Sequence, residues 1–196
     1  MTTQANHSSE INLPAHVREV FANASCIYTR QEVEQSLDKM ATDISYALSH
    51  TNPVLLCVVL GGIVPLGNLL PRLDFPLEID YVHVGRYGHG STGGGLNWLV
   101  EPKISLKDRT VLIVDDILDG GITLAELTEF CKKEGARMVQ SAVLVDKKAP
   151  RDPSGLEKAD FSALTTEDRF LFGFGMDYKG YLRNAPGIYM VAPEHQ

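Results

Sequence analysis

The sequence has few cysteines, and they are not arranged as a metal site or a disulfide framework. The chain of 196 residues contains three, Cys26, Cys57 and Cys131, at wide spacings and without a CxxC pair. An odd, scattered set disfavours structural zinc and disulfides and favours a reducing, cytoplasmic setting. Because Cys57 lies inside an apolar run, we expect it to be a small core residue.

Long apolar runs and an excess of positive charge are also missing. No run of about 18 apolar residues occurs, so we expect no membrane-spanning helix and no membrane partner. The net charge is −7, and the basic residues are scattered apart from Lys147, Lys148 and Arg151. Nucleic-acid-binding proteins usually carry a basic face, so no nucleic acid is expected as a partner. Residues 1–10 are polar and lack the apolar segment of a secretory signal, and we expect residues 1–12 to be a disordered tail.

What remains is the composition of an ordinary globular protein. Hydrophobic residues make up 44% and charged residues 22% of the chain. This length is sufficient for one domain with its own hydrophobic core. We therefore treat residues 1–196 as a single domain.

Helical and extended patterns alternate along the chain. A capping box from Thr29 to Glu32 predicts the start of a helix that ends near Ser49. Its expected apolar face consists of Val33, Leu37, Met40, Ile44 and Ala47. The other expected elements are helices at 63–70 and 122–134 and strands at 54–60, 77–84, 97–100, 110–114, 138–145, 170–174 and 187–191. This alternation predicts an α/β fold, with a mainly parallel central sheet flanked by helices.

Ligands of such sheets bind beyond the carboxyl ends of the strands. The segments expected there are residues 60–62, the glycine-rich loop after Gly85, residues 115–123 and residues 146–148. The continuous apolar run at 54–60 is typical of a parallel strand that is buried on both faces. The glycine-rich loop is expected to be mobile.

Residues 111–123 carry the most informative pattern in the sequence. An apolar strand is expected to deliver Asp115 and Asp116 to its carboxyl end, and Asp119, two glycines and a helix follow. Glycine amides and a helix N-terminus suit a phosphate, and vicinal carboxylates suit a ribose diol or Mg²⁺. Asp119 lies between these groups, where it could act on a reacting base. Two alternatives are a phospho-acceptor receiver domain and a solvated acidic turn that caps the helix.

The same segment resembles the PRPP-binding signature of the type I phosphoribosyltransferases, where PRPP is phosphoribosyl pyrophosphate. The shared pattern is an apolar strand, two acids, two apolar residues, and Asp-[Ser/Thr]-Gly-x-Thr. The resemblance covers about residues 28–191 and is strongest to hypoxanthine-guanine phosphoribosyltransferases. It implies the type I fold, with a small hood built from chain-terminal segments. It also implies a homodimer or homotetramer that uses PRPP, a 6-oxopurine and Mg²⁺.

The resemblance also implies roles for individual residues. Asp119 is the implied catalytic residue. The implied PRPP contacts are Asp115, Asp116, Gly120, Gly121, Ile122, Thr123, Leu60, Gly61 and Arg183. The implied purine contacts are Lys147, Phe170, Leu171 and Asp177, and the implied Mg²⁺ ligands are Asp115, Asp116 and Asp177. Arg86 and Tyr87 open an implied flexible lid at 86–97.

Within this resemblance, the side chains of the purine site have separate implied tasks. The Lys147 ammonium would donate to a 6-oxo group, and the Phe170 ring would stack on the base. Leu171 and Asp177 would lie near its N1–C2 edge. The alternatives are a surface lysine for Lys147 and a plain core residue for Phe170. Arg183 can likewise be a surface arginine, and the glycines at 60–62 and after Gly85 can be ordinary turns.

The chain departs from the family pattern at three positions. Asp115 stands where glutamate is frequent, Gly120 where a hydroxyl residue is frequent, and Leu60 where a basic residue is frequent. These changes bear on affinity and substrate preference more than on the class of reaction. The alternative functions are a xanthine-preferring phosphoribosyltransferase and a non-catalytic regulator that senses nucleotides.

Overall fold

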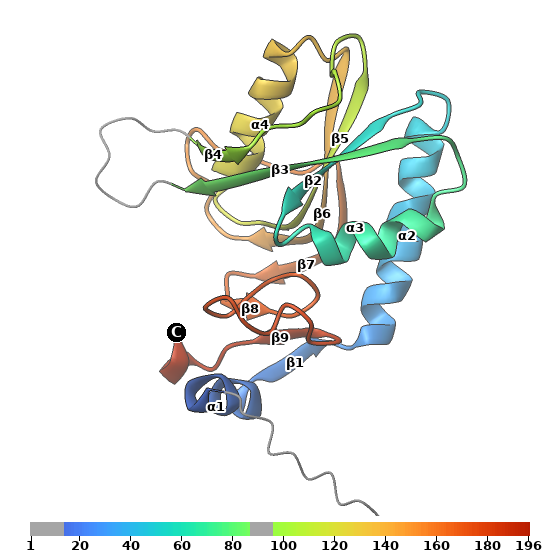
Figure 1. The fold of residues 1–196 in the computed structure, drawn as a ribbon. Helices are drawn as coiled ribbons and strands as arrows, with labels where there is room; N and C mark the ends of the chain where they lie inside the picture. Colours follow the sequence, from blue (N-terminus) through green and yellow to red (C-terminus); the bar gives the residue numbers. More distant parts are fainter. Residues whose placement is uncertain (1–13, 87–95) are drawn as a thin grey trace, which may run out of the picture.

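The computed structural model describes residues 14–86 and 96–196 (Figure 1). The expected tail at 1–12 and most of the expected lid, Tyr87 included, lie outside the described residues. Arg86 is the last residue of a strand, and its side chain is also outside the description. Within the described ranges, no helix has both the length and the apolar character needed to cross a membrane.

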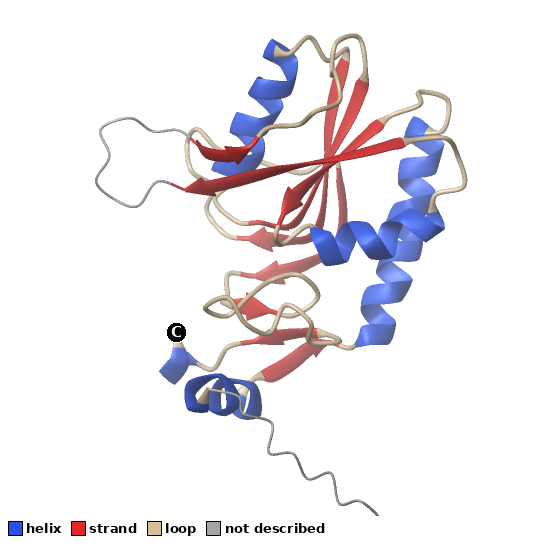
Figure 2. Cartoon of the chain, in the orientation of Figure 1, coloured by secondary structure: helices blue, strands red, loops and turns tan. Residues whose placement is uncertain are grey.

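A six-stranded sheet forms the centre of the fold, in the order β4-β3-β2-β5-β6-β7 (Figure 2). All neighbouring strands in it run parallel except β3 and β4. The prediction of a mainly parallel α/β sheet is thus confirmed. The strands are β2 (Val54–Val59), β3 (Glu78–Arg86), β4 (Leu96–Val100), β5 (Thr110–Leu118), β6 (Met138–Lys148) and β7 (Phe161–Glu167).

Helices cover both faces of this sheet, which explains the continuous apolar sequence of β2. Alternate side chains of a strand point to opposite faces. Leu55 and Cys57 pack with residues of α2 (Arg30–Leu48) and α3 (Ile63–Leu69). Leu56 packs on the other face with residues of α4 (Ile122–Lys133). Figure 1 shows α2 and α3 on one side of the sheet and α4 on the other.

The predicted start of α2 is confirmed in detail. The Thr29 hydroxyl accepts from the Glu32 amide, and the Glu32 carboxylate accepts from the Thr29 amide across 2.8 Å. This reciprocal capping box satisfies two of the free amides at the helix start. Ala47, expected on the apolar face, is exposed, and Ala41 and Leu48 are buried in addition to the other predicted residues.

A smaller layer lies beyond the carboxyl ends of the parallel strands and corresponds to the expected hood (Figure 1). Its sheet has the order β1-β9-β8 and is antiparallel, so a strand from the first thirty residues pairs with one near the C-terminus. Phe172 and Tyr189 stack with ring centroids 5.3 Å apart in its core. The hood elements are α1 (Ala15–Asn23), β1 (Ser25–Tyr28), β8 (Leu171–Phe172) and β9 (Ile188–Met190). Short 3-10 turns occupy Leu70–Arg72 and Pro193–His195.

Strands β5 and β6 extend further at their carboxyl ends than the sequence pattern predicted, and this alters the placement of the acid pair. The prediction ended β5 at Val114, but the strand continues to Leu118. Asp115 and Asp116 therefore lie within the strand, near its carboxyl end. β6 also continues, to Lys148, and pairs with β5 as far as Leu118. Polar side chains are tolerated there because this end of the sheet faces the cavity rather than the core. The elements α1, β1 and β7 were not predicted.

Candidate active site

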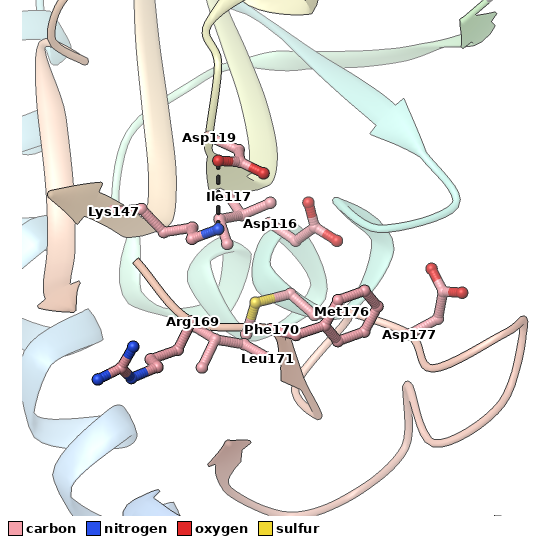
Figure 3. Close-up of a pocket in the computed structure, with 9 residues that line it drawn as sticks. All are labelled: Asp116, Ile117, Asp119, Lys147, Arg169, Phe170, Leu171, Met176 and Asp177. Atoms are coloured by element: carbon pink, nitrogen blue, oxygen red, sulfur yellow. Dashed lines mark hydrogen bonds and ion pairs between the residues drawn. The ribbon is translucent and has the colours of Figure 1, made fainter. Parts of the chain in front are cut away.

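A cavity of about 170 Å³ lies between the carboxyl ends of β5 and β6 and the hood (Figure 3). Pockets for drug-sized ligands usually measure about 300–1,000 Å³, so this cavity suits a smaller ligand. The sheet contributes carboxylates and an ammonium group, and the hood contributes an aromatic and aliphatic wall. The lining residues are Asp116, Ile117, Asp119, Lys147, Arg169, Phe170, Leu171, Met176 and Asp177.

The two acids of β5 are not equivalent. Asp116 lines the cavity, whereas Asp115 is buried and its carboxylate accepts from the Asp116 amide across 2.8 Å. Burial raises the pKa of Asp116, while hydrogen bonding from Asp115 and the charge of Arg183 act in the opposite direction. Burial, with both acids nearby, also raises the pKa of the Cys57 thiol to about 12, so Cys57 is the inert core residue expected.

The turn from β5 into α4 has free amides at the helix start. Gly121 occupies the left-handed region, with φ +83°, and no side chain caps the helix. The carbonyls of Gly120 and Gly121 accept from the amides of Asp152 and Leu156, each across 3.0 Å. A Cβ at Gly121 would lie 2.4 Å from the Leu156 carbonyl oxygen, which explains the glycine. These hydrogen bonds hold the two carbonyls in place. The amides at the start of α4 have no side-chain cap and are suited to bind an anion. Ile122 and Thr123 form the first turn of α4 and are half-buried.

Arg151 secures this turn from behind, a role that sequence reasoning did not assign. Its guanidinium donates to the carbonyl oxygens of Leu118 and Asp119, at 3.2 and 2.5 Å. It also forms an ion pair with Asp146, and both side chains are largely buried. A planar fork with several donors can hold a loop in one conformation. The only sequence signal was the local clustering of Arg151 with two lysines.

Lys147 and Lys148, adjacent at the end of β6, point to different environments. Lys147 is 7% exposed, and its Nζ lies 3.2 Å from Asp119 Oδ1 and 2.8 Å from Asp168 Oδ1. Figure 3 shows it extending from the sheet toward Asp119. Lys148 is exposed and lies 3.4 Å from Glu167. Lys147, rather than Lys148, therefore faces the cavity, and the alternative of a surface lysine at residue 147 does not hold.

The hood forms the apolar wall of the cavity. Phe170 is 46% exposed and makes an edge contact with Tyr178, with ring centroids 6.0 Å apart. Leu171 and Met176 are buried next to it. Figure 3 shows the side chains of Phe170 and Met176 close together, and the guanidinium of Arg169 turned away from them. An exposed ring at the cavity wall is inconsistent with the alternative that Phe170 is a core residue.

Arg183 connects the hood to the acid pair. Its guanidinium lies 2.6 Å from Asp177 and 3.8 Å from Asp116, and it donates to the Gly175 carbonyl across 2.6 Å. A Cβ at Gly175 would lie 2.3 Å from the Gly61 carbonyl oxygen, so the two backbones touch. The segment of Gly61 is thereby brought next to Asp116, Asp177 and Arg183. Arg183 itself is not among the residues that line the cavity.

The segment after β2 contains a cis peptide between Val59 and Leu60. Leu60 is 53% exposed, and Gly61 is buried against the Asp116 carboxylate. The leucine side chain adds no charge at this point. A contact between this segment and pyrophosphate stays a prediction.

The described residues contain no cluster of three or more His, Cys, Asp or Glu side chains that would form a closed metal cage. Magnesium is usually held by one or two carboxylates, with waters and substrate oxygens completing its shell. Asp116 and Asp177 both line the cavity, which fits this mode of binding. Asp177 also accepts from the Gly180 amide across 2.7 Å and pairs with Arg183, so its carboxylate is held in place.

The parallel sheet, the uncapped helix start after an acid pair and the hooded cavity suit an enzyme that binds a phosphorylated substrate. The chain belongs to the phosphoribosyltransferase family, because the phosphoribosyl transferase domain matches residues 23–179.

The relatives carry a more specific enzyme name than the family, and two of the three described next are of similar length to this chain. The hypoxanthine-guanine phosphoribosyltransferase of Streptococcus pneumoniae (strain ATCC BAA-255 / R6) is 30% identical over 169 residues, which is 86% of this chain and 93% of the relative. That of Bacillus subtilis is 28% identical over 171 residues, 85% of this chain and 92% of the relative. The bifunctional protein TilS/HprT of Listeria innocua is 30% identical over 169 residues, which is 86% of this chain and only 26% of that protein.

Solved structures agree with these matches. A hypoxanthine phosphoribosyltransferase from Staphylococcus aureus superposes with a TM-score of 0.80 at 25% identity, covering 87% of this chain and 92% of that one. The Trypanosoma cruzi hypoxanthine phosphoribosyl transferase gives the same TM-score, identity and coverage, 0.80, 25%, 87% and 92%. The fold is therefore that of the type I phosphoribosyltransferases.

Proposed function

We propose that this protein transfers the 5-phosphoribosyl group of PRPP to N9 of hypoxanthine or guanine, giving IMP or GMP and pyrophosphate, in purine salvage. The observation that carries this proposal is the Lys147 ammonium, buried at the end of β6 and directed into a cavity walled by Phe170. A donor with no acceptor capacity beside a stacking ring suits a base that presents an oxo group. The printed names of the relatives support the same reaction.

PRPP would bind along the ends of β2 and β5. The amides of residues 120–123 at the start of α4 hold the 5′-phosphate, since they have no side-chain cap. Asp115 and Asp116 hold the ribose hydroxyls. The segment of Leu60 and Gly61, with Arg183 beside it, holds the pyrophosphate. Gly120 has no side-chain hydroxyl, so at this position only the backbone can donate to the phosphate.

Mg²⁺ would be held by Asp116 and Asp177, with Asp115 beside them, together with substrate oxygens. When bound, it supplies neutralisation of the charge that develops on the departing pyrophosphate. Carboxylates next to the ribose also stabilise positive charge at C1 as the leaving-group bond breaks.

The purine would occupy the cavity with its ring against Phe170. Lys147 donates to the 6-oxo group, and Leu171 and Asp177 lie at the N1–C2 edge. Asp119, at the mouth of the phosphate turn, takes up the purine proton near N7 while N9 attacks C1. Its side chain is 46% exposed, so a proton accepted there can reach solvent.

We further propose that the enzyme works in the cytoplasm as a homodimer or homotetramer. All three cysteines are unpaired, which fits a reducing compartment. Apolar side chains on β3 and at the start of α3 are exposed and suit contact with a second copy. They are Leu60, Ile63, Ile79 and Tyr81. Light scattering behind a size-exclusion column checks the mass.

A single assay tests the reaction. The protein is incubated with Mg²⁺-PRPP and separately with hypoxanthine, guanine, xanthine or adenine, and the nucleotide is identified by mass. IMP and GMP are expected, with adenine inert. A relative from Tritrichomonas foetus, 27% identical over 162 residues, is named hypoxanthine-guanine-xanthine phosphoribosyltransferase, so xanthine is included. Faster turnover of xanthine would replace the proposal with the xanthine-preferring alternative, and nucleotide binding without turnover would favour the regulator.

A further inference from the structure

We infer that Asp168 is a positioning residue for purine recognition: it anchors the Lys147 ammonium so that one N–H is left for the 6-oxo group of the base. This inference rests on the proposed function. Asp168 comes from the turn between β7 and β8, and the family resemblance gave it no role.

The geometry accounts for the donors of the ammonium. Nζ lies 2.8 Å from Asp168 Oδ1 and 3.2 Å from Asp119 Oδ1. A lysine ammonium has three N–H donors and no acceptor, so two are engaged and one remains. Lys147 lines the cavity, so the remaining donor would serve a base bound there. Within the pair the lysine side chain is 9% exposed and the Asp168 side chain is 57% exposed, so the buried ammonium depends on these partners while the carboxylate stays in contact with water.

Of the two carboxylates, Asp168 is the one suited to act as a permanent anchor. Its contact with Lys147 is the shorter, and the hydrogen bond from Lys147, followed by the charges of Lys147 and Arg169, lowers the pKa of Asp168. Asp119, by contrast, must exchange a proton with the purine. Lys147 already donates to Asp119 across 3.2 Å, and without Asp168 this would be the one carboxylate left to hold the ammonium in place.

The position of Asp168 in the chain adds a second link. It precedes Phe170 by two residues, so the ion pair with Lys147 joins the end of β6 to the segment that carries the stacking ring. The base would be contacted by Lys147 at one end of this ion pair and by Phe170, which follows Asp168, at the other. One carboxylate therefore sets the distance between the oxo-group donor and the aromatic wall.

The chain provides its own control one residue away. Lys148 and Glu167 form the neighbouring pair, 3.4 Å apart, with 63% and 74% of their side chains exposed. Exposed pairs of this kind contribute little to stability. Glu167→Gln therefore removes the same charge as Asp168→Asn one residue earlier, at the end of β7, without removing a partner of Lys147.

The experiment measures steady-state kinetics for both substrates. Asp168→Asn should lower kcat/KM for hypoxanthine and guanine about tenfold or more, the scale of one hydrogen bond to a charged group, while KM for PRPP changes less than about twofold. Glu167→Gln should match the wild type, and Asp168→Glu should recover much of the loss. In a Lys147→Met background, Asp168→Asn should add no further loss, because its action passes through the lysine.

The outcomes separate the inference from the proposed function. A wild-type protein that forms no nucleotide overturns both. An active wild type in which Asp168→Asn equals Glu167→Gln overturns the inference and leaves the function standing. Equal losses for PRPP and purine, or additive losses with Lys147→Met, would assign Asp168 a general structural role and also overturn it.

Discussion

The Cα of Gly61 lies so close to Asp116 that a Cβ at residue 61 would be 2.1 Å from Oδ2. Real side chains do not approach this closely, so the carboxylate would have to move. Asp116 is also surrounded by Asp115 and Arg183, which limits where it can go. The glycine after β2 is thus required by a side chain from β5, and the two strands jointly build the site.

Gly61→Ala should therefore impair the use of PRPP. We expect kcat/KM for PRPP to fall at least about tenfold, because even a displacement of about 1 Å at a site can cost up to about a hundredfold in rate. Gly67 in α3 is the matched control, since a Cβ there meets nothing within 4 Å. Gly67→Ala should keep activity and add about 0.5–1 kcal/mol to the free energy of unfolding. Equal kinetics for both variants would contradict this account.

Asp116→Asn should weaken PRPP use and at the same time raise the melting temperature at neutral pH. Burial raises the pKa of this acid in the fold, so its ionised form costs stability above that pKa. The cost disappears as pH falls below the ordinary carboxyl range, and the difference in melting temperature should vanish with it. Thermal melts at several pH values and PRPP kinetics provide the check. A melting temperature below that of the wild type at neutral pH would disprove the stability argument.

The double variant with Asp115→Asn should also fold and lose PRPP use.

Asp119→Asn should lower kcat much more than it changes either KM. A group that accepts a proton in the reaction contributes on the order of 10²–10⁴ in rate. Asparagine keeps the shape of the side chain and cannot accept the proton. Single-turnover kinetics with hypoxanthine measure the effect, and a loss below about threefold would show that Asp119 only shapes the turn.

Lys147→Met should reduce kcat/KM for hypoxanthine and guanine by roughly 1.5–3 kcal/mol in free-energy terms, the value of a hydrogen bond to a charged group. Methionine retains much of the apolar stem and removes the donor. PRPP binding measured without purine should hardly change. Lys148→Met is the control and should be mild, because Lys148 points to solvent and Glu167. Loss of activity with Lys148→Met alone would mean that Lys148, and not Lys147, contacts the base.

Chelation of divalent cations should abolish nucleotide formation, and added Mg²⁺ should restore it. The basis is the pairing of Asp116 and Asp177 at the cavity with a pyrophosphate substrate, a set of hard oxygen ligands. The assay follows IMP formation with excess chelator and then with Mg²⁺ in excess of the chelator. Full turnover in excess chelator would refute the metal requirement.

Local sequence patterns determined the parts of the fold that depend on nearby residues. The capping box before α2, the doubly buried strand β2 and the glycines before α4 were predictable because each pattern is read over a few consecutive positions. The family resemblance then predicted Lys147 and Phe170 as partners in one site, and the structure places both at the same cavity.

Tertiary structure alone decided which distant polar groups meet. Asp168 and Lys147 are 21 residues apart by their numbers, and Arg151 reaches back to Leu118. A strand was expected at 170–174, but only the folded chain shows that β8 is limited to two residues and pairs with β9 in the smaller sheet. A hydrophobic period reports the buried face of its own element, whereas an ion pair between loops depends on how the elements pack. The contact of Asp168 with Lys147 and that of Arg151 with the turn before α4 therefore became visible only in the folded chain.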